Sequence, residues 1–330
     1  MAVVIVVARA VGALFRRFHQ HPVIGEVVAG IALGPSLLGS WSNGLFPLET
    51  RPLLRILASL GLAVFMFLVG LEMDLAHLGG NQRRRISGAV ALLGTAVPFG
   101  LGVVLATALH PEHGAGDFLP FALFIGAAMS TTAFPVLARI LQERKLYDTP
   151  LGVLTMASAA GDDVLTWAVL AVVVAIVAAT GAWTLPYILL LSVGFVVLML
   201  VAVRPALARY RDRSMGTTEL TLVVAGLLAA AFVTSTIGIH EIFGAFLFGA
   251  VFPRGPLADA VRDRLRSVVA ILLPVFFVTT GLNVDIGGVG VEGLWHLFLI
   301  LVVACAGKLI GAGAGARMQG LAARESLALG

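Results

Sequence analysis

Two adjacent carboxylates in the middle of a long apolar stretch are well suited to ion chemistry. Asp162 and Asp163 follow Gly161 within segment 150–180. Asp162 stands 12 residues after Pro150, or ~18 Å along a helix, close to the middle of a hydrocarbon layer about 30 Å thick. Neighbouring helical side chains point about 100° apart, so the two acids can face different partners. Packed together at low dielectric they should not both ionise easily. The pair can therefore exchange a proton for a cation.

A basic side chain, Lys308, falls inside another apolar segment, 293–316. It stands 9 residues before Arg317, or ~14 Å of helix, so Lys308 and Asp162 are expected at similar depth. Charges at this depth cost roughly 3 kcal/mol or more each, which makes each one a functional candidate. We favour an ion pair between Lys308 and Asp162. The alternative is that the Lys308 amine reaches water along its own apolar stem.

A proline interrupts segment 118–141, where Thr131 and Thr132 precede Pro135. Pro135 has no N–H and clashes with the carbonyl of Thr131, so it should break the helix. In lipid such a break is tolerated where it lines a cavity, and half-helix ends near the acids are typical of secondary transporters. The two threonine hydroxyls would add oxygens suited to a monovalent cation. An ordinary proline kink is the alternative.

The composition indicates that these groups are held in place by the helices of a membrane protein. Of 330 residues, 59% are hydrophobic and 12% are charged, against roughly 25% charged in an ordinary globular domain, and the mean hydropathy is +1.01. A soluble protein is excluded. The net charge is +4, but short basic clusters between apolar runs do not form the stripe that a nucleic-acid partner needs. Cys305 is the single cysteine, so no internal disulfide can form.

The sequence predicts eleven helical segments, since a membrane span needs about 20 apolar residues. The second and the ninth are short and interrupted by glycine. The segments are 1–18, 23–40, 55–73, 85–109, 118–141, 150–180, 185–203, 218–235, 239–252, 266–283 and 293–316.

The basic residues divide unequally between alternate loops. One set of loops holds 18 of the 22 Lys and Arg residues, and the opposite set holds Arg51 and Arg55. The positive-inside rule makes the first set cytoplasmic and places Met1 outside. Three other charged residues keep open roles. Glu26 and Glu241 are explained equally well as vestibule acids or as solvated interfacial acids, and Arg9 lies half a helix deep with no assigned partner.

An internal repeat joins two parts of the chain. Residues 24–30 (IGEVVAG) resemble 243–249 (FGAFLFG), and residues 65–74 (FMFLVGLEMD) resemble 276–285 (FFVTTGLNVD). The orientation derived from the charges reverses the direction of each pair, so we expect an inverted repeat, as in many secondary transporters. Chance similarity is the alternative, because Gly and Phe are common in membrane helices.

These residues together resemble the monovalent cation:proton antiporter-2 family, which includes bacterial sodium/proton exchangers and potassium-efflux antiporters. The resemblance covers nearly the whole chain. It implies that Asp163 is the essential cation and proton ligand, that Asp162 pairs with Lys308, and that Thr131 and Thr132 lie at an unwound crossing. The stretches that carry it are VIGE at 23–26, GPSLLG at 34–39, GLEMD at 70–74 and AGDD at 160–163.

The predicted fold is an all-α membrane protein, a polytopic helical bundle with inverted-topology repeats and a discontinuous helix. One transmembrane antiporter domain would fill residues 1–330, with 23–180 repeated in inverted form by 239–330. Residues 324–330 resemble the start of a further helix, so we expect a chain truncated at its C-terminus with an incomplete second repeat. The resemblance implies a dimerising scaffold domain and a core domain that moves like an elevator.

The predicted function is proton-coupled antiport of Na+ or K+, with Asp163 and Asp162 as transient ligands of the cation. The sequence separates neither sodium from potassium nor one stoichiometry from another. The expected partners are protons, the cation, the lipid bilayer and a second copy of the chain, with no cofactor. The expected location is the inner or plasma membrane.

Three alternatives remain, one of which is an inactive or regulatory remnant of such an antiporter. A passive cation channel would normally repeat one pore motif around a symmetry axis. An intramembrane aspartyl protease would place its acids on two facing helices, and Asp74 and Asp285 lie at helix ends where they cannot supply the second one. We therefore do not expect an enzyme.

Overall fold

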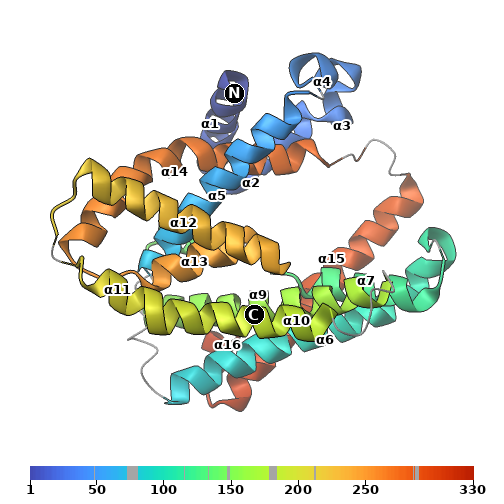
Figure 1. Ribbon diagram of the computed structural model, residues 1–330. Coiled ribbons are helices and arrows are strands. Elements are labelled where there is room, and N and C mark those ends of the chain that lie inside the picture. Colours follow the sequence, from blue (N-terminus) through green and yellow to red (C-terminus); the bar gives the residue numbers. More distant parts are fainter. Residues whose placement is uncertain are drawn as a thin grey trace. The chain divides into compact units, whose positions relative to one another are not determined.

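The described part of the chain is helical. The computed structural model describes residues 1–47, 49–72, 81–114, 116–132, 134–146, 149–177, 184–211, 213–284, 286 and 290–330. Its helices, all labelled in Figure 1 except α8 and η2, are α1 (Ala2–Arg17), α2 (Pro22–Leu33), α3 (Pro35–Leu38), α4 (Ser40–Leu45), α5 (Arg51–Glu72), α6 (Asn81–His113), α7 (Phe118–Ser130), α8 (Phe134–Glu143), α9 (Pro150–Val177), α10 (Thr184–Leu198), the π-helical turn η2 (Met199–Val203), α11 (Arg204–Ala208), α12 (Thr217–Ile237), α13 (Glu241–Val251), α14 (Pro256–Leu282), α15 (Val291–Met318) and α16 (Ala323–Leu329).

The all-helical membrane fold predicted from the sequence is confirmed. Within the described residues, six helical stretches are long and apolar enough to cross a membrane. The predicted start of the tenth segment at residue 266 is wrong, because α14 already begins at Pro256, where proline fits the first position of a helix. Asp74 and Asp285, which close the second repeat match, lie outside the described residues. The inverted relation and the truncation stay predictions.

Two compact units make up the chain. Unit 1 comprises Met1–Met73 and Val193–Val289, and unit 2 comprises Asp74–Ser192 and Gly290–Gly330. The single antiporter domain expected over residues 1–330 stays a prediction.

In unit 1 each half of the repeat packs on the other. Helix α2 of the first half packs on α14 of the second, and α13 of the second half packs on α5 of the first. Gly30 and Gly281 meet at the first crossing, and Gly70 and Gly249 lie at the second. A Cβ on any of these four glycines would overlap a main-chain carbonyl oxygen of the facing helix. Small residues of this kind let membrane helices approach to main-chain contact. The repeated glycines thus set the closest approaches in unit 1.

The position of Arg9 is explained by a proline in α14. Pro274 lies inside that helix and has no N–H, so the carbonyl of Ala270, four residues earlier, loses its helical donor. Helix α1 packs on α14, and the Arg9 guanidinium donates a hydrogen bond of 2.6 Å to the Ala270 oxygen. An unsatisfied carbonyl is costly in lipid. Arg9 therefore fills the gap that the proline leaves.

Replacing Arg9 by leucine is expected to destabilise the protein, because the Ala270 carbonyl lies at the surface of the chain and lipid offers it no other donor. In a Pro274→Ala background the helix supplies its own N–H, so the same replacement should cost less. Unfolding in mixed detergent micelles measures both differences, with Arg16→Leu at the exposed end of α1 as the control. Equal losses in the two backgrounds would contradict this role.

In unit 2, α6 packs along α15, α7 and α9. One apolar cluster between these helices consists of Ile86, Val90, Leu154, Ala312 and Ala316. Gly311 and Gly315 of α15 lie against main-chain carbonyls of α6 at the same close range. These helices hold the polar residues that the sequence singles out.

Candidate functional site

Helix α9 carries both acids into the interior of unit 2. Asp162 is 5% exposed and Asp163 is 4% exposed. The rest of this helix is mainly apolar, so the carboxylates depend on polar groups from other helices. The structure supplies these groups for Asp162.

Asp162 is paired and hydrogen-bonded through both of its oxygens. Its Oδ2 lies 2.8 Å from the Lys308 amine of α15 and accepts a hydrogen bond from the Thr132 hydroxyl. Its Oδ1 accepts a hydrogen bond of 2.5 Å from the Thr95 hydroxyl of α6. The charge of Asp162 is thus compensated within unit 2.

Lys308 makes three further contacts. Its amine donates to the Gly94 carbonyl at 3.0 Å, to the Ser130 carbonyl at 2.6 Å and to the Thr132 hydroxyl at 2.6 Å. The Gly94 carbonyl stands four residues before Pro98 of α6, so proline has removed its helical donor. Ser130 ends α7, where helix carbonyls also lack partners. Lys308 therefore neutralises an acid and satisfies two main-chain oxygens.

The chain leaves helical structure between α7 and α8. Thr131 and Thr132 lie in this interruption, and Pro135 is the second residue of α8, where its missing N–H is not required. The two threonines differ. Thr132 contacts Asp162 and Lys308, whereas the Thr131 hydroxyl donates to the Ala127 carbonyl at 3.1 Å.

Asp163 differs from its neighbour. Within the described part of the chain, no hydrogen bond or ion pair involves its buried carboxylate. The structure therefore brings together Asp162, Thr132 and Lys308, and places Asp163 next to Asp162 in α9 with no donor from the described residues. The roles of these residues in transport stay predictions.

A cavity of about 430 Å³ in unit 2 reaches Asp162. Its polar lining consists of Thr131, Thr132, Thr155, Ser158, Asp162 and Lys308, together with the main chain. Asp163 is not part of this lining. The buried hydroxyl of Ser158 has no hydrogen-bond partner among the described residues, so it is free to contact water or an ion in the cavity.

Sequence reasoning missed the contribution of α6. Thr95 and the Gly94 carbonyl both lie within hydrogen-bonding distance of the central charges. Pro98, four residues after Gly94 in an apolar stretch, was the available signal, because it predicts a main-chain carbonyl in need of a donor.

The chain matches a family profile described as sodium/hydrogen exchanger, transmembrane, over residues 2–330. It is 39% identical over 343 residues to the Na(+)/H(+) antiporter NhaS4 of Synechocystis sp., covering 99% of this chain and 83% of that protein. It is also 39% identical over 353 residues to Cation/H(+) antiporter 20 of Arabidopsis thaliana, covering all of this chain and 42% of the plant protein. The K(+)/H(+) antiporter 1 of Saccharomyces cerevisiae is 31% identical over 337 residues, with 96% of this chain and 38% of the yeast protein covered.

A solved structure shares the fold. The sodium proton antiporter MjNhaP1 of Methanocaldococcus jannaschii matches with a TM-score of 0.68 at 14% identity, covering 99% of this chain and 80% of that one. The chain spans about two fifths of the length of the Arabidopsis relative named above.

Proposed function

Because the chain belongs to the transmembrane sodium/hydrogen exchanger family, we propose that it exchanges protons for Na+ or K+ across a membrane. The names of its relatives include sodium/proton, potassium/proton and cation/proton antiporters. The observation that carries the proposal is a difference in charge compensation between two buried neighbouring carboxylates. Asp162 is neutralised by Lys308 at 2.8 Å, while Asp163 is buried next to it and forms no ion pair with any described residue.

In the proposed cycle Asp163 holds either a proton or the metal cation. Oxygen ligands suit alkali cations, as they suit other hard cations. Asp162 and the hydroxyls of Thr131, Thr132 and Ser158 supply oxygens along the cavity. Lys308 keeps the charge of Asp162 balanced while Asp163 changes its occupant. The site therefore alternates between two loaded forms of similar charge.

The proposed transport step is an elevator-type movement that gives alternating access. Every residue named above as part of the site belongs to unit 2, so we assign the moving core to unit 2 and the scaffold to unit 1. A homodimer built on unit 1 is the proposed assembly. We place the arginine-rich loops in the cytoplasm and Met1 outside, in the inner or plasma membrane, on the distribution of basic residues.

The test is proton movement in everted vesicles that contain the full chain and a pH-sensitive dye. After acidification of the vesicles, NaCl or KCl is expected to restore the dye signal, and choline chloride is not. Recovery that is independent of the added cation would exclude exchange and indicate a leak or channel. Silence with both cations would contradict antiport and favour the transport-inactive remnant.

A further inference from the structure

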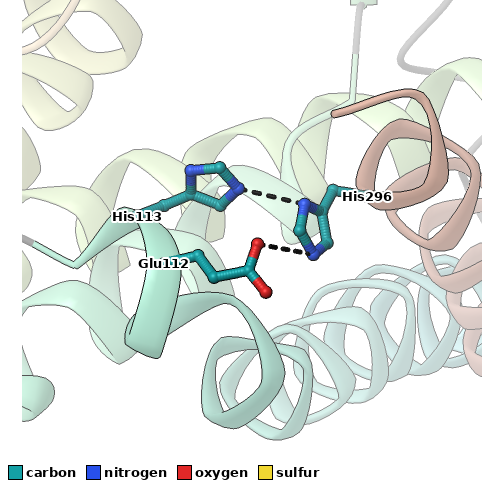
Figure 2. Close-up of side chains that lie close together, drawn as sticks. All are labelled: Glu112, His113 and His296. Atoms are coloured by element: carbon teal, nitrogen blue, oxygen red, sulfur yellow. Dashed lines mark hydrogen bonds and ion pairs between the residues drawn. The ribbon is translucent and has the colours of Figure 1, made fainter. Parts of the chain in front are cut away.

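Three metal-ligating side chains meet at the ends of two helices in unit 2. Glu112 and His113 close α6, and His296 lies near the start of α15 (Figure 2). His296 precedes Lys308 by 12 residues on the same helix, or ~18 Å. The cluster is therefore separate from the Asp162 site.

The ligand atoms converge from both helices. His113 Nε2 lies 3.0 Å from His296 Nδ1, and His296 Nε2 lies 3.6 Å from a carboxylate oxygen of Glu112 (Figure 2). One ligand atom from each residue can be chosen so that all lie within 4.8 Å of one another. Zn–N and Zn–O bonds of about 2.0–2.2 Å place two tetrahedral ligands about 3.4 Å apart. The two short contacts use different nitrogens of the His296 ring, so a shared ion can take only one of them, and Glu112 or His113 must turn to bring its ligand atom within that distance.

The burial of the three side chains favours a site assembled around His296. The His296 side chain is 13% exposed, whereas Glu112 is 54% exposed and His113 is also exposed. A fixed ring therefore stands beside two side chains that can turn to meet an ion. The exposed side gives the ion access and leaves a position for water.

We propose that Glu112, His113 and His296 bind Zn2+, with water as the fourth ligand. Two imidazoles and one carboxylate are a ligand set that zinc uses with an open position. Mg2+ and Ca2+ prefer oxygen ligands alone. Bound zinc joins α6 to α15, the two helices that contribute Thr95 and Lys308 to the other site. Zinc thereby stabilises the packing of the two helices that surround Asp162, without binding at the Asp162 site.

The test is zinc binding to the purified full chain in detergent, freed of metal by a chelator and measured by titration calorimetry and thermal unfolding. We expect one zinc ion per chain, a higher melting temperature with zinc, and no such effect of Mg2+. His113→Gln and His296→Gln are each expected to weaken zinc binding by more than about 10-fold, which the loss of even an outer-shell partner can cost. The absence of zinc binding to the parent chain would overturn the proposal.

The matched control is His110→Gln. His110 lies on the same end of α6, but its Nε2 contacts the Gly116 carbonyl and its ring packs on Phe118 and Phe121. Zinc affinity that is lost equally in this control and in His113→Gln would overturn the site.

A ligand swap tests the site without removing a ligand. His113→Cys is expected to keep zinc binding and to raise the affinity for Cd2+ relative to Zn2+, because a thiolate is a softer ligand than imidazole. An unchanged cadmium preference in a folded variant would contradict ligation by residue 113.

Discussion

Vesicles that contain the Asp163→Asn variant are expected to show no cation-dependent proton movement above the background of empty vesicles. Asparagine keeps the size of the side chain and removes its capacity to take up and release a proton. Because Asp163 is buried and makes no hydrogen bond among the described residues, the replacement breaks no hydrogen bond within that part of the chain. We therefore expect an unchanged melting temperature together with complete loss of exchange.

The neighbouring acid provides the matched control. Asp162→Asn removes the partner of Lys308 and is expected to lower stability, which Asp163→Asn does not. If Asp163→Asn vesicles exchanged cations at the parent rate, Asp163 would not be the carrier of the proton. A folded Asp163→Asn protein that is silent with Na+ and K+ supports that assignment.

Lys308→Ala is expected to destabilise the protein by about 3–5 kcal/mol, the range found when one partner of a buried ion pair is removed. The variant leaves the carboxylate of Asp162 without its cation. It also leaves the Gly94 and Ser130 carbonyls without the donor that they share. Unfolding in mixed detergent micelles measures the loss.

A double-mutant cycle separates the ion pair from the rest of this loss. Combining Lys308→Ala with Asp162→Asn removes both charges, so the double variant should be more stable than the sum of the single losses predicts. Strict additivity would show that Lys308 does not stabilise Asp162. The stability that the double variant fails to regain includes the contacts of Lys308 with the two carbonyls and with the Thr132 hydroxyl.

Helix geometry allows much of the site to be predicted from the sequence. The rise per residue places Asp162 and Lys308 at similar depth before any fold is known, and the structure joins them at 2.8 Å. Charges are informative here because an apolar helix tolerates them only with a partner. The same argument flagged Arg9 as unusual but could not name Ala270, which is 261 residues away in the chain.

The details that the sequence did not supply depend on side-chain direction. Thr131 and Thr132 look equivalent as neighbours, yet only Thr132 contacts Asp162, because the chain leaves helical geometry between α7 and α8. Thr95 carries no charge, so nothing in its own chemistry separates it from other threonines in apolar helices. Its role follows from α6 packing on α9, which is a tertiary fact.

The glycine crossings limit how this protein can change shape. Some helices are held at main-chain contact, as at Gly30 and Gly281 in unit 1 or at Gly311 in unit 2. They cannot slide past each other, because sliding would drive carbonyl oxygens into the opposing backbone. Shear between packed helices is one of the two common routes of domain motion, and hinged displacement of whole bodies is the other. We therefore expect each unit to move as a rigid body.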